Sequence, residues 1–322
     1  MSHPFILGTR GSELALAQAT MTREALAAVG VDCVVKIVQT IGDKRPDLKL
    51  SEFSQGENPV VDKGIFTKEL EEALLKREID FAVHSLKDVP TELGPEFEIC
   101  ATLPRAETPD VLLTTEEGFG ADLTLLHGKT IATSAVRRAR QLSWLCQDVK
   151  VVDIRGNVPT RIRKLIASAE WDGILLARAG IERLGIYTPG ESSFDFEGTT
   201  VYARELDEKQ FLPAAGQGAV GIEILRESDA VREALSKINH APTFTRVTGE
   251  RAYLAALKAG CQTPVGAKTW FEDGGATLAM AVRVFDETDP ASEPFVAEVR
   301  GPANEPAALA EQLMTLKRAK FS

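Results

Sequence analysis

The order of elements along the chain repeats, and this repetition limits the possible folds more than any other feature. A short apolar run, Phe5–Thr9, is followed by a polar turn and a helical pattern over Glu13–Ala28. The same plan returns at residues 130–134, with a helix that starts at Ala135. Strand patterns at residues 33–40, 97–103, 151–154 and 173–177 alternate with further helical patterns. The resulting β-α-β-α-β order predicts two α/β units of similar design, each built on a parallel sheet.

Composition limits the partners. The chain has 322 residues and a net charge of −10, so we expect no nucleic-acid partner, and any bound anion needs a local group of cations. The first residues have neither the basic stretch nor the long apolar run of a signal peptide, and no apolar segment is long enough to span a bilayer. We therefore expect no membrane partner and a cytoplasmic location. Four scattered cysteines with no C-x-x-C and no paired histidine predict neither a metal site nor disulfides.

Residues 80–92, DFAVHSLKDVPTE, combine an apolar strand end with several polar groups. Phe81 to Val83 are followed at once by hydroxyl, ammonium and carboxylate side chains, and Pro90 ends any regular element. In an α/β fold, chemistry is usual at such a strand end. Asp88, next to the cation of Lys87, is the candidate catalytic residue. The simpler interpretation is a surface turn with a solvated Lys-Asp pair.

Arginine recurs at the strand-to-helix turns. Arg10 occupies the first turn, Arg137 and Arg138 begin the helix after residues 130–134, and Arg155 with Arg161 flanks the turn after residues 151–154. These turns lie at the carboxyl edge of a parallel sheet, where ligands bind. Each arginine taken alone is a solvated surface residue. Together they indicate a ligand with several carboxylates or phosphates, because the planar guanidinium suits both groups.

Three segments of the chain are less regular. Residues 45–61 read as a long polar loop, a lid or a disordered segment, and residues 187–209 as a polar, irregular insertion. Residues 216–221, GQGAVG, match a dinucleotide-binding pattern literally, but a proline precedes them and a β-branched run follows. Because that pattern should follow a strand and open a helix, we interpret them as a glycine-rich crossover into a strand.

The C-terminal part is predicted to be a small α+β unit. It comprises a helix over residues 243–259 that ends at Gly260, strands at residues 265–270, 276–285 and 295–300, and a helix over residues 306–320. Cys261 lies in the turn after the first helix, between polar residues. A free cysteine is usually a small buried hydrophobe, and that alternative stays open on the residues alone.

Seven stretches together resemble the porphobilinogen deaminase family. They are TRGSELALAQ from Thr9, KGIFTKELE from Lys63, VHSLKDVPT from Val83, TSAVRRARQL from Thr133, DIRGNVPTR from Asp153, LPAAGQGAVGIE from Leu212 and ERAYLAALKAGCQTPVGA from Glu250. They cover nearly the whole chain in a fixed order. The sequence departs from the family at residues 61–62, where a pair of glycines is common, at Ala135, where serine is common, and in the longer insertion after Tyr187.

The resemblance implies a function and a set of site residues. The family condenses four porphobilinogen molecules, with release of ammonia, onto a dipyrromethane cofactor that is thioether-linked to one cysteine, and then releases hydroxymethylbilane. The resemblance makes Asp88 catalytic and Cys261 the point of attachment. The resemblance implies two further groups of residues. Those that bind the cofactor are Lys87, Ser12, Thr133, Arg137, Arg138 and Arg155, and those that bind the substrate are Arg10, Arg161, Arg183, Gln217, Phe66 and Lys63.

The resemblance also implies a fold: two similar α/β domains of the periplasmic-binding-protein type with a cleft between them, plus the C-terminal α+β domain. We expect residues 1–104 with 218–238 to form domain 1, residues 105–217 domain 2 and residues 239–322 domain 3, in a monomer. Two other functions compete. One is a non-catalytic anion-binding protein on the same plan. The other is a nicotinamide enzyme, which would need an acidic residue at a strand end about 20 residues after its glycines.

Overall fold

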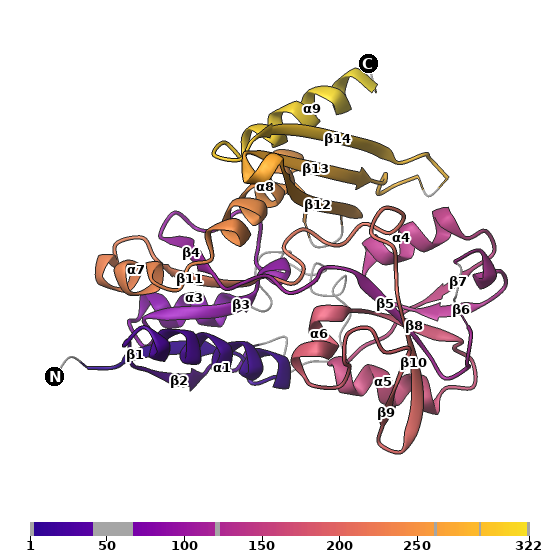
Figure 1. Ribbon diagram of the computed structural model, residues 1–322, viewed down its shortest axis with the longest axis horizontal. Helices are drawn as coiled ribbons and strands as arrows, with labels where there is room; N and C mark the ends of the chain where they lie inside the picture. The colour runs from indigo at the N-terminus through magenta and orange to yellow at the C-terminus, as the bar shows by residue number, and fades with distance from the viewer. Residues whose placement is uncertain (1–2, 41–66, 120–122, 261–262, 290, 321–322) are drawn as a thin grey trace, which may run out of the picture.

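The protein is described here from a computed structural model, which describes residues 3–40, 67–119, 123–260, 263–289 and 291–320. Three sheets organise it, and each forms the centre of one unit (Figure 1). The first α/β unit lies at the N-terminal side, the second lies beside it, and the C-terminal unit sits over the junction of the two (Figure 1). The predicted fold class, two α/β units with a small C-terminal α+β unit, is confirmed.

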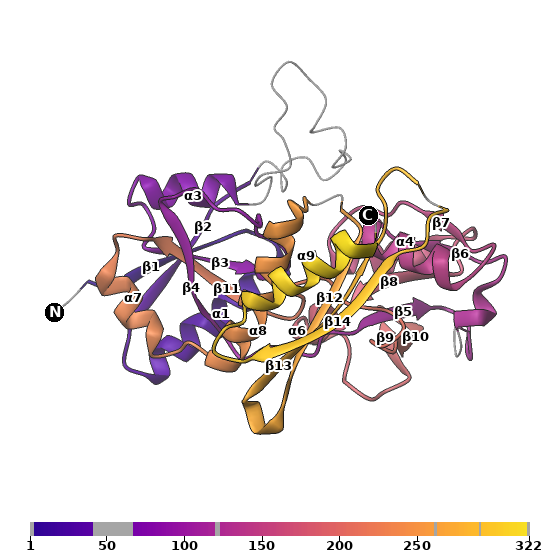
Figure 2. The same cartoon turned by 90° about the horizontal axis from the view of Figure 1, so that it is seen from above.

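The first α/β unit has a five-stranded sheet in the order β2-β1-β3-β11-β4. Its strands are β1 (Phe5–Thr9), β2 (Cys33–Ile37), β3 (Phe81–Ser85), β4 (Phe97–Thr102) and β11 (Val220–Leu225). Helix α1 (Glu13–Ala28) covers one face and α3 (Lys68–Leu75) the other, while α7 (Asp229–Ser236) packs near β4 (Figure 2). β11 is buried along its whole length, so it forms the centre of this core.

The second α/β unit has a six-stranded sheet in the order β7-β6-β8-β5-β10-β9. Its strands are β5 (Asp110–Thr114), β6 (Thr130–Ala132), β7 (Lys150–Val152), β8 (Gly173–Ala177), β9 (Ser193–Phe196) and β10 (Thr199–Glu205). Its helices are α4 (Val136–Leu145), α5 (Val158–Ala167) and α6 (Arg178–Arg183), with a short 3-10 turn η3 at Leu123–Leu126.

The two units repeat one arrangement, as the sequence predicts. In each, three parallel strands (β2-β1-β3 and β7-β6-β8) are followed by an antiparallel one. The predicted parallel sheet is therefore present in each unit as three of its strands, and the antiparallel neighbour is the difference from the prediction. β11 enters the first sheet from the second unit and β5 enters the second sheet from the first. Neither is preceded by a crossover helix that would set it parallel to its neighbour.

Residues 187–209 are not the irregular insertion that the sequence suggests. They contain β9 and β10, an antiparallel hairpin that extends the second sheet. Glu197 and Gly198 both have positive φ, 54° and 85°, as a two-residue hairpin turn requires. Phe194, Phe196 and Val201 are buried in the core of the second unit. These apolar residues alternate with polar ones, and this alternation is the sequence signal that would have predicted the two strands.

The C-terminal unit packs two helices on one antiparallel sheet, β12 (Val265–Glu272), β13 (Thr277–Val284) and β14 (Phe295–Pro302), with a short turn η4 at Asp273–Gly275. The helices are α8 (Ala241–Leu257) and α9 (Ala308–Lys320). Gly260 was predicted to end this helix, but α8 ends earlier, at Leu257. Lys258 takes the left-handed position with φ 54°, and its N–H bonds back to Ala255 and Leu254.

Two linkers join the α/β units and run side by side. The chain leaves the first sheet at Thr102 and returns to it at Val220. The N–H of Ala106 donates to the Gly218 carbonyl at 3.1 Å, and the N–H of Leu103 to the Val220 carbonyl at 3.2 Å. The glycine-rich crossover predicted for residues 216–221 is confirmed, since it leads into β11. Within the described residues, no helix is long and apolar enough to cross a membrane.

Candidate active site

Asp88 lies on a short turn at the end of β3. The strand continues into a 3-10 turn, η2 (Leu86–Asp88), after which the backbone becomes extended at Val89. Leu86 and Val89 are buried, while Lys87 and Asp88 are exposed. The two apolar side chains thus anchor the turn in the first unit and leave both charged groups pointing outwards.

The crossover packs directly against this turn. A Cβ on Gly216 would lie 3.2 Å from the Lys87 backbone nitrogen, and Gly216 has φ +72°. A Cβ on Gly218, with φ +79°, would lie 2.4 Å from the Ala106 carbonyl oxygen. These glycines therefore allow three backbone segments to meet behind Asp88, and this accounts for the motif without a dinucleotide.

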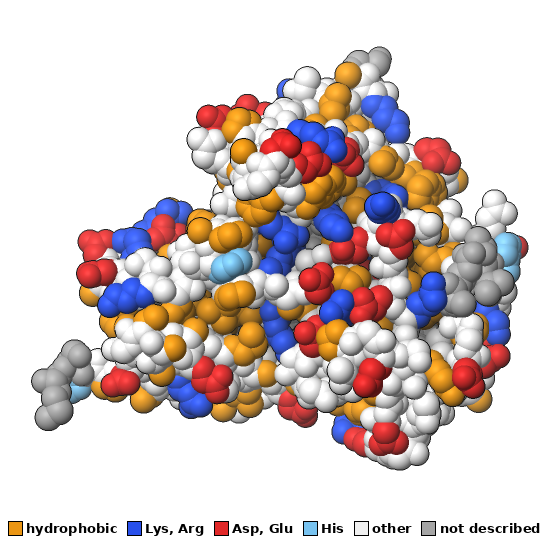
Figure 3. All heavy atoms as spheres, in the orientation of Figure 1, with side chains coloured by type: hydrophobic (Ala, Val, Ile, Leu, Met, Phe, Trp, Pro, Cys, Tyr) orange, Lys and Arg blue, Asp and Glu red, His pale blue; other side chains and the backbone are white. Residues whose placement is uncertain are grey.

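Charges from the second α/β unit reach the turn. Surrounding protein lowers the pKa of Lys87 to about 8, an effect that Asp88 opposes and Arg138 reinforces. The Lys87 side chain is nevertheless exposed to water. Burial, together with Arg138 and Arg155, lowers the pKa of Arg161 to about 10, and Asp88 opposes that change. Asp88 and Lys87 thus face the basic turns of the second unit, and Figure 3 shows Lys and Arg side chains where the units meet.

Arg137 and Arg138 are not the exposed turn residues that the sequence suggests. Both are buried and bind one buried carboxylate, Asp110. The Arg137 Nη1 donates to Asp110 Oδ2 at 2.7 Å, and Arg138 donates to Asp110 Oδ1 from Nη2 at 2.7 Å and from Nε at 3.0 Å. The two guanidinium groups hold the pKa of Asp110 well below its usual range. Their second partners are the carbonyls of Leu212 and Leu175.

Gln217 and Arg183 meet at the crossover. The Gln217 Nε2 donates to the Thr108 carbonyl at 2.7 Å and to Asp110 Oδ1 at 3.0 Å, so it belongs to the same buried network. Its Oε1 is buried and has no hydrogen-bond partner in the described part of the chain. Arg183 donates to the Gly218 carbonyl, and burial lowers its pKa to about 10.

The remaining predicted residues lie at strand-to-helix turns. Arg10 follows β1 and is half-buried. The Ser12 Oγ caps α1 by accepting from the Ala15 N–H at 3.3 Å, which confirms the predicted cap. Thr133 is buried after β6. Arg155 donates from Nε to Asp153 at 3.0 Å, and the Arg161 Nε donates to the Gly156 carbonyl at 2.8 Å.

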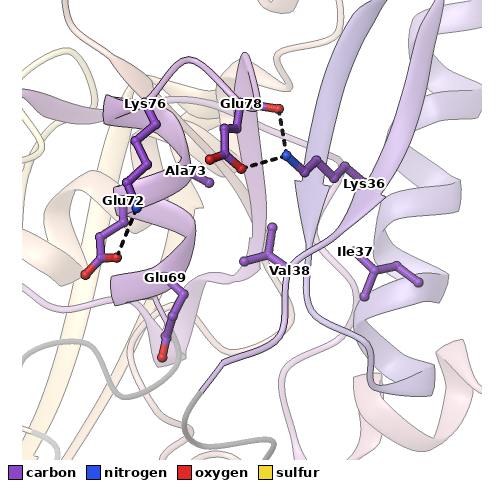
Figure 4. A pocket seen from close by; sticks show the side chains of 8 residues that line it. All are labelled: Lys36, Ile37, Val38, Glu69, Glu72, Ala73, Lys76 and Glu78. Carbon is purple, nitrogen blue, oxygen red and sulfur yellow. Dashed lines mark hydrogen bonds and ion pairs between the residues drawn. The ribbon is translucent and has the colours of Figure 1, made fainter.

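Three predicted site residues, Cys261, Lys63 and Phe66, lie outside the described residues, as does the loop at residues 45–62. A pocket of about 230 Å³ lies elsewhere, between β2 and α3 (Figure 4). Its lining contains two ion pairs, Lys36 with Glu78 at 2.8 Å and Lys76 with Glu72 at 3.7 Å (Figure 4). It contains none of the predicted residues. No group of His, Cys, Asp and Glu within the described ranges is arranged to hold a metal.

Sequence reasoning missed the carboxylates that hold this site together. Asp110 is one, and Glu250 of α8 is another. The Glu250 Oε1 and Oε2 accept from Arg105 at 2.8 and 2.9 Å, and Oε2 also accepts from the Gly216 N–H at 2.7 Å. Neither residue is part of a charge pattern in the sequence. Their partners come from distant elements, so no local signal could have found them.

The arrangement defines a class of protein: two α/β units joined by paired linkers, with one exposed carboxylate near a group of cations that suits a ligand carrying several carboxylates. Comparison with known proteins narrows this class. Residues 5–233 match the model of the porphobilinogen deaminase dipyromethane cofactor binding domain, and residues 244–315 match the C-terminal domain of the same enzyme. The chain belongs to the porphobilinogen deaminase family.

Sequences of curated porphobilinogen deaminases align with most of this chain. The porphobilinogen deaminase of Desulforudis audaxviator is 40% identical over 315 residues, 97% of this chain and 94% of that one. That of Syntrophobacter fumaroxidans is 40% identical over 283 residues, 87% of this chain and 84% of that one. Among solved structures, an arginine transport periplasmic binding protein from Legionella pneumophila covers 74% of this chain and 92% of its own, at 14% identity and a TM-score of 0.41.

The family establishes the activity. The chain is a transferase of tetrapyrrole biosynthesis, a hydroxymethylbilane synthase that uses porphobilinogen and a dipyrromethane cofactor. The predicted family, function and cofactor are therefore confirmed. The non-catalytic anion-binding alternative is not favoured.

Proposed function

We propose that Asp88 is the carboxylate at which this chemistry takes place. Its position supports the proposal: it is an exposed anion at a strand end, held by buried Leu86 and Val89 and facing cations of the second unit. Loss of ammonia from porphobilinogen leaves a cationic carbon framework. A fixed carboxylate beside it stabilises the developing charge and can accept or return a proton.

We propose that dipyrromethane is attached at Cys261 and held by the basic turns. The donor set supports this fit. Burial and neighbouring cations lower the pKa values of Lys87 and Arg161, so their positive charges are incompletely balanced, and carboxylates would complete the balance. When bound, the cofactor supplies the free pyrrole α-carbon to which the first substrate is joined.

The roles of the other residues follow from their positions. Arg10, Arg155 and Arg161 stand at turns where guanidinium groups can bind acetate and propionate side chains, and each such bond contributes about 1.5–3 kcal/mol. Ser12 lies in the turn of Arg10, Thr133 lies in the turn after β6, and Arg183 lies at the end of α6 beside the Gly218 carbonyl. Arg137 and Arg138 keep their proposed role at the cofactor and Gln217 its role at the substrate, and each of them also donates to the buried Asp110. Lys63 and Phe66 keep their proposed role in substrate binding.

We also propose the domain division 1–104 with 218–238, 105–217 and 239–322, a monomeric state and a cytoplasmic location. The division is supported by the sheets, since β11 at Val220–Leu225 joins the first and β12–β14 form the third. The monomer and the compartment follow from the resemblance and from the composition.

Asp88→Asn tests the catalytic role. Asparagine keeps the shape but cannot balance a developing cation, so we expect folding to be unchanged and ammonia release from porphobilinogen to be nearly abolished. Asp32→Asn, at an exposed position before β2, is the matched control and should release ammonia at the wild-type rate. Near-normal turnover in Asp88→Asn would refute the assignment.

Intact-protein mass tests the attachment site. The purified protein should be heavier than its sequence by one dipyrromethane, and peptide mapping should place that mass on the segment with Gly260 and Gln262. Cys261→Ser should remove most of the adduct, because a hydroxyl at its ordinary pKa is a weak nucleophile compared with a thiolate. Wild-type protein of unmodified mass that still makes the tetrapyrrole would reject the cysteine-linked mechanism.

A further inference from the structure

Helix α8 of the C-terminal unit is bonded closely to the first α/β unit. The His240 N–H, at its cap, donates to the Thr102 carbonyl at 2.7 Å, and Val247 packs in one small apolar cluster with Leu86 and Val89. Leu86 and Val89 are the two side chains that anchor the Asp88 turn. The packing of α8 therefore bears directly on where Asp88 stands.

Arg251, one turn further along α8, binds the backbone that follows Asp88. Its Nη2 donates to the Pro90 carbonyl at 2.7 Å and to the Thr91 carbonyl at 3.2 Å, and its Nη1 donates to the Val89 carbonyl at 3.3 Å. Among the residues that the structure describes, no other donor reaches these three carbonyls. One guanidinium group thus donates hydrogen bonds to all three backbone carbonyls that follow Asp88.

A second bond joins the same segment to the end of α8. The Thr91 Oγ1 donates to the Ala259 carbonyl at 3.3 Å, two residues before Cys261 in the sequence. The exit of the Asp88 turn is therefore tied to α8 at Arg251 and beyond the helix at Ala259. Both ties come from the unit whose sequence carries the proposed attachment cysteine.

The guanidinium group of Arg251 is half-buried. Burial lowers its pKa, and the negative charge of Glu223 opposes that change. Glu223 lies on β11, is fully buried and contacts His84 Nε2 through Oε2 at 2.9 Å. Glu223 and the three turn carbonyls therefore compensate for the lost hydration of the guanidinium group, which favours a single fixed geometry.

We propose that Arg251 is a positioning residue that holds the Asp88 turn in a fixed place relative to helix α8, and hence to the chain segment that leads to Cys261. The inference rests on the proposed roles of Asp88 and Cys261. It follows that removing Arg251 should slow turnover without changing which residue carries the cofactor. A displacement of about 1 Å at a reacting centre is enough to reduce the rate about 100-fold.

The test compares Arg251→Met, Arg251→Lys and a matched control, Arg140→Met. Arg140 also donates from its guanidinium to a backbone carbonyl, that of Asp289 at 2.9 Å, but between the second and C-terminal units. For each variant, kcat and KM for porphobilinogen are measured by ammonia release, the cofactor load by intact mass, and the folded fraction by urea titration.

We expect Arg251→Met to keep its dipyrromethane mass and its KM within about threefold, and to lose about 100-fold in kcat. Arg251→Lys should recover part of that loss, because an ammonium group can still reach one or two of the carbonyls. Arg140→Met should keep its wild-type kcat. A wild-type kcat in Arg251→Met, or a loss that lysine does not reduce and that matches the unfolded fraction, would overturn the proposal.

Two further measurements keep the result decisive. If Arg251→Met does not fold, Thr91→Val removes only the bond to Ala259, and a severalfold lower kcat in fully folded protein supports the proposal while a wild-type kcat rejects it. Asp88→Asn is run in parallel. Its normal turnover would refute the proposed function itself, whereas an inactive Asp88→Asn beside a normal Arg251→Met would refute the positioning role alone.

Discussion

Arg138→Leu should destabilise the fold, in contrast to what a solvated turn arginine would do. Arg138 is 5% exposed and makes three hydrogen bonds, two to Asp110 and one to the Leu175 carbonyl. Leucine fills part of the space but donates nothing. The substitution therefore changes the balance of a buried charge cluster rather than a surface contact.

The expected loss in the free energy of unfolding follows from the hydrogen bonds that remain to Asp110. Of its four described side-chain hydrogen bonds, Arg138→Leu leaves two, one from Arg137 and one from Gln217. Breaking a buried ion pair by removing one partner costs about 3–5 kcal/mol. Because Arg137 still compensates the carboxylate, we expect a loss near the lower end, about 3 kcal/mol. Asp110→Asn, which leaves two guanidinium groups without their carboxylate, should lie at the upper end.

Urea unfolding followed by circular dichroism measures the free energy of unfolding, and ammonia release measures turnover on the same samples. Arg163→Leu is the control, since Arg163 pairs with Glu197 on the exposed surface and its loss should leave the urea midpoint unchanged. An Arg138→Leu protein with wild-type stability and no turnover would refute the reasoning. It would show that Arg138 acts on the ligand rather than in the buried cluster.

Three other properties can be checked. Folding lowers the pKa values of Asp110 and Glu250 below 3.8 and 4.5, so their stabilisation is present above those values, and urea midpoints should fall as the pH drops below them. Lys87, with a pKa lowered from 10.5 to about 8, loses its charge as the pH rises through about 8; KM for porphobilinogen should therefore rise there, and Lys87→Met should remove that rise. Gly218→Ala should cost more than about 2 kcal/mol, because strain at φ +79° adds to a 2.4 Å backbone clash, whereas Gly190→Ala, at φ +88° with open space, should show the strain of about 1 kcal/mol alone.

Local patterns in the sequence were sufficient for most of the elements. The strand Phe5–Thr9, the Ser12 cap and the helix Glu13–Ala28 are as predicted, because apolar periodicity and capping depend on neighbours within a few residues. The repeat of strand, turn and helix also predicted two units of similar design. The hairpin of β9 and β10 could have been found as well, since its positive-φ pair, Glu197 and Gly198, lies between alternating apolar residues.

The sequence by itself determined the family, the placing of Asp88 at a strand end and the recurrence of arginine at the turns. Only the tertiary structure decided what those arginines do. Asp110 lies 28 residues from Arg138 and 107 residues from Gln217, and their meeting depends on β5 entering the second sheet antiparallel to β8. Arg251 and the turn it holds are about 160 residues apart, and they meet because α8 packs against the first unit. The periodicity of a sequence indicates which face of a helix or strand is buried. It does not indicate which residue pairs with a buried charge, because that counterion comes from a separate element and is set by tertiary packing.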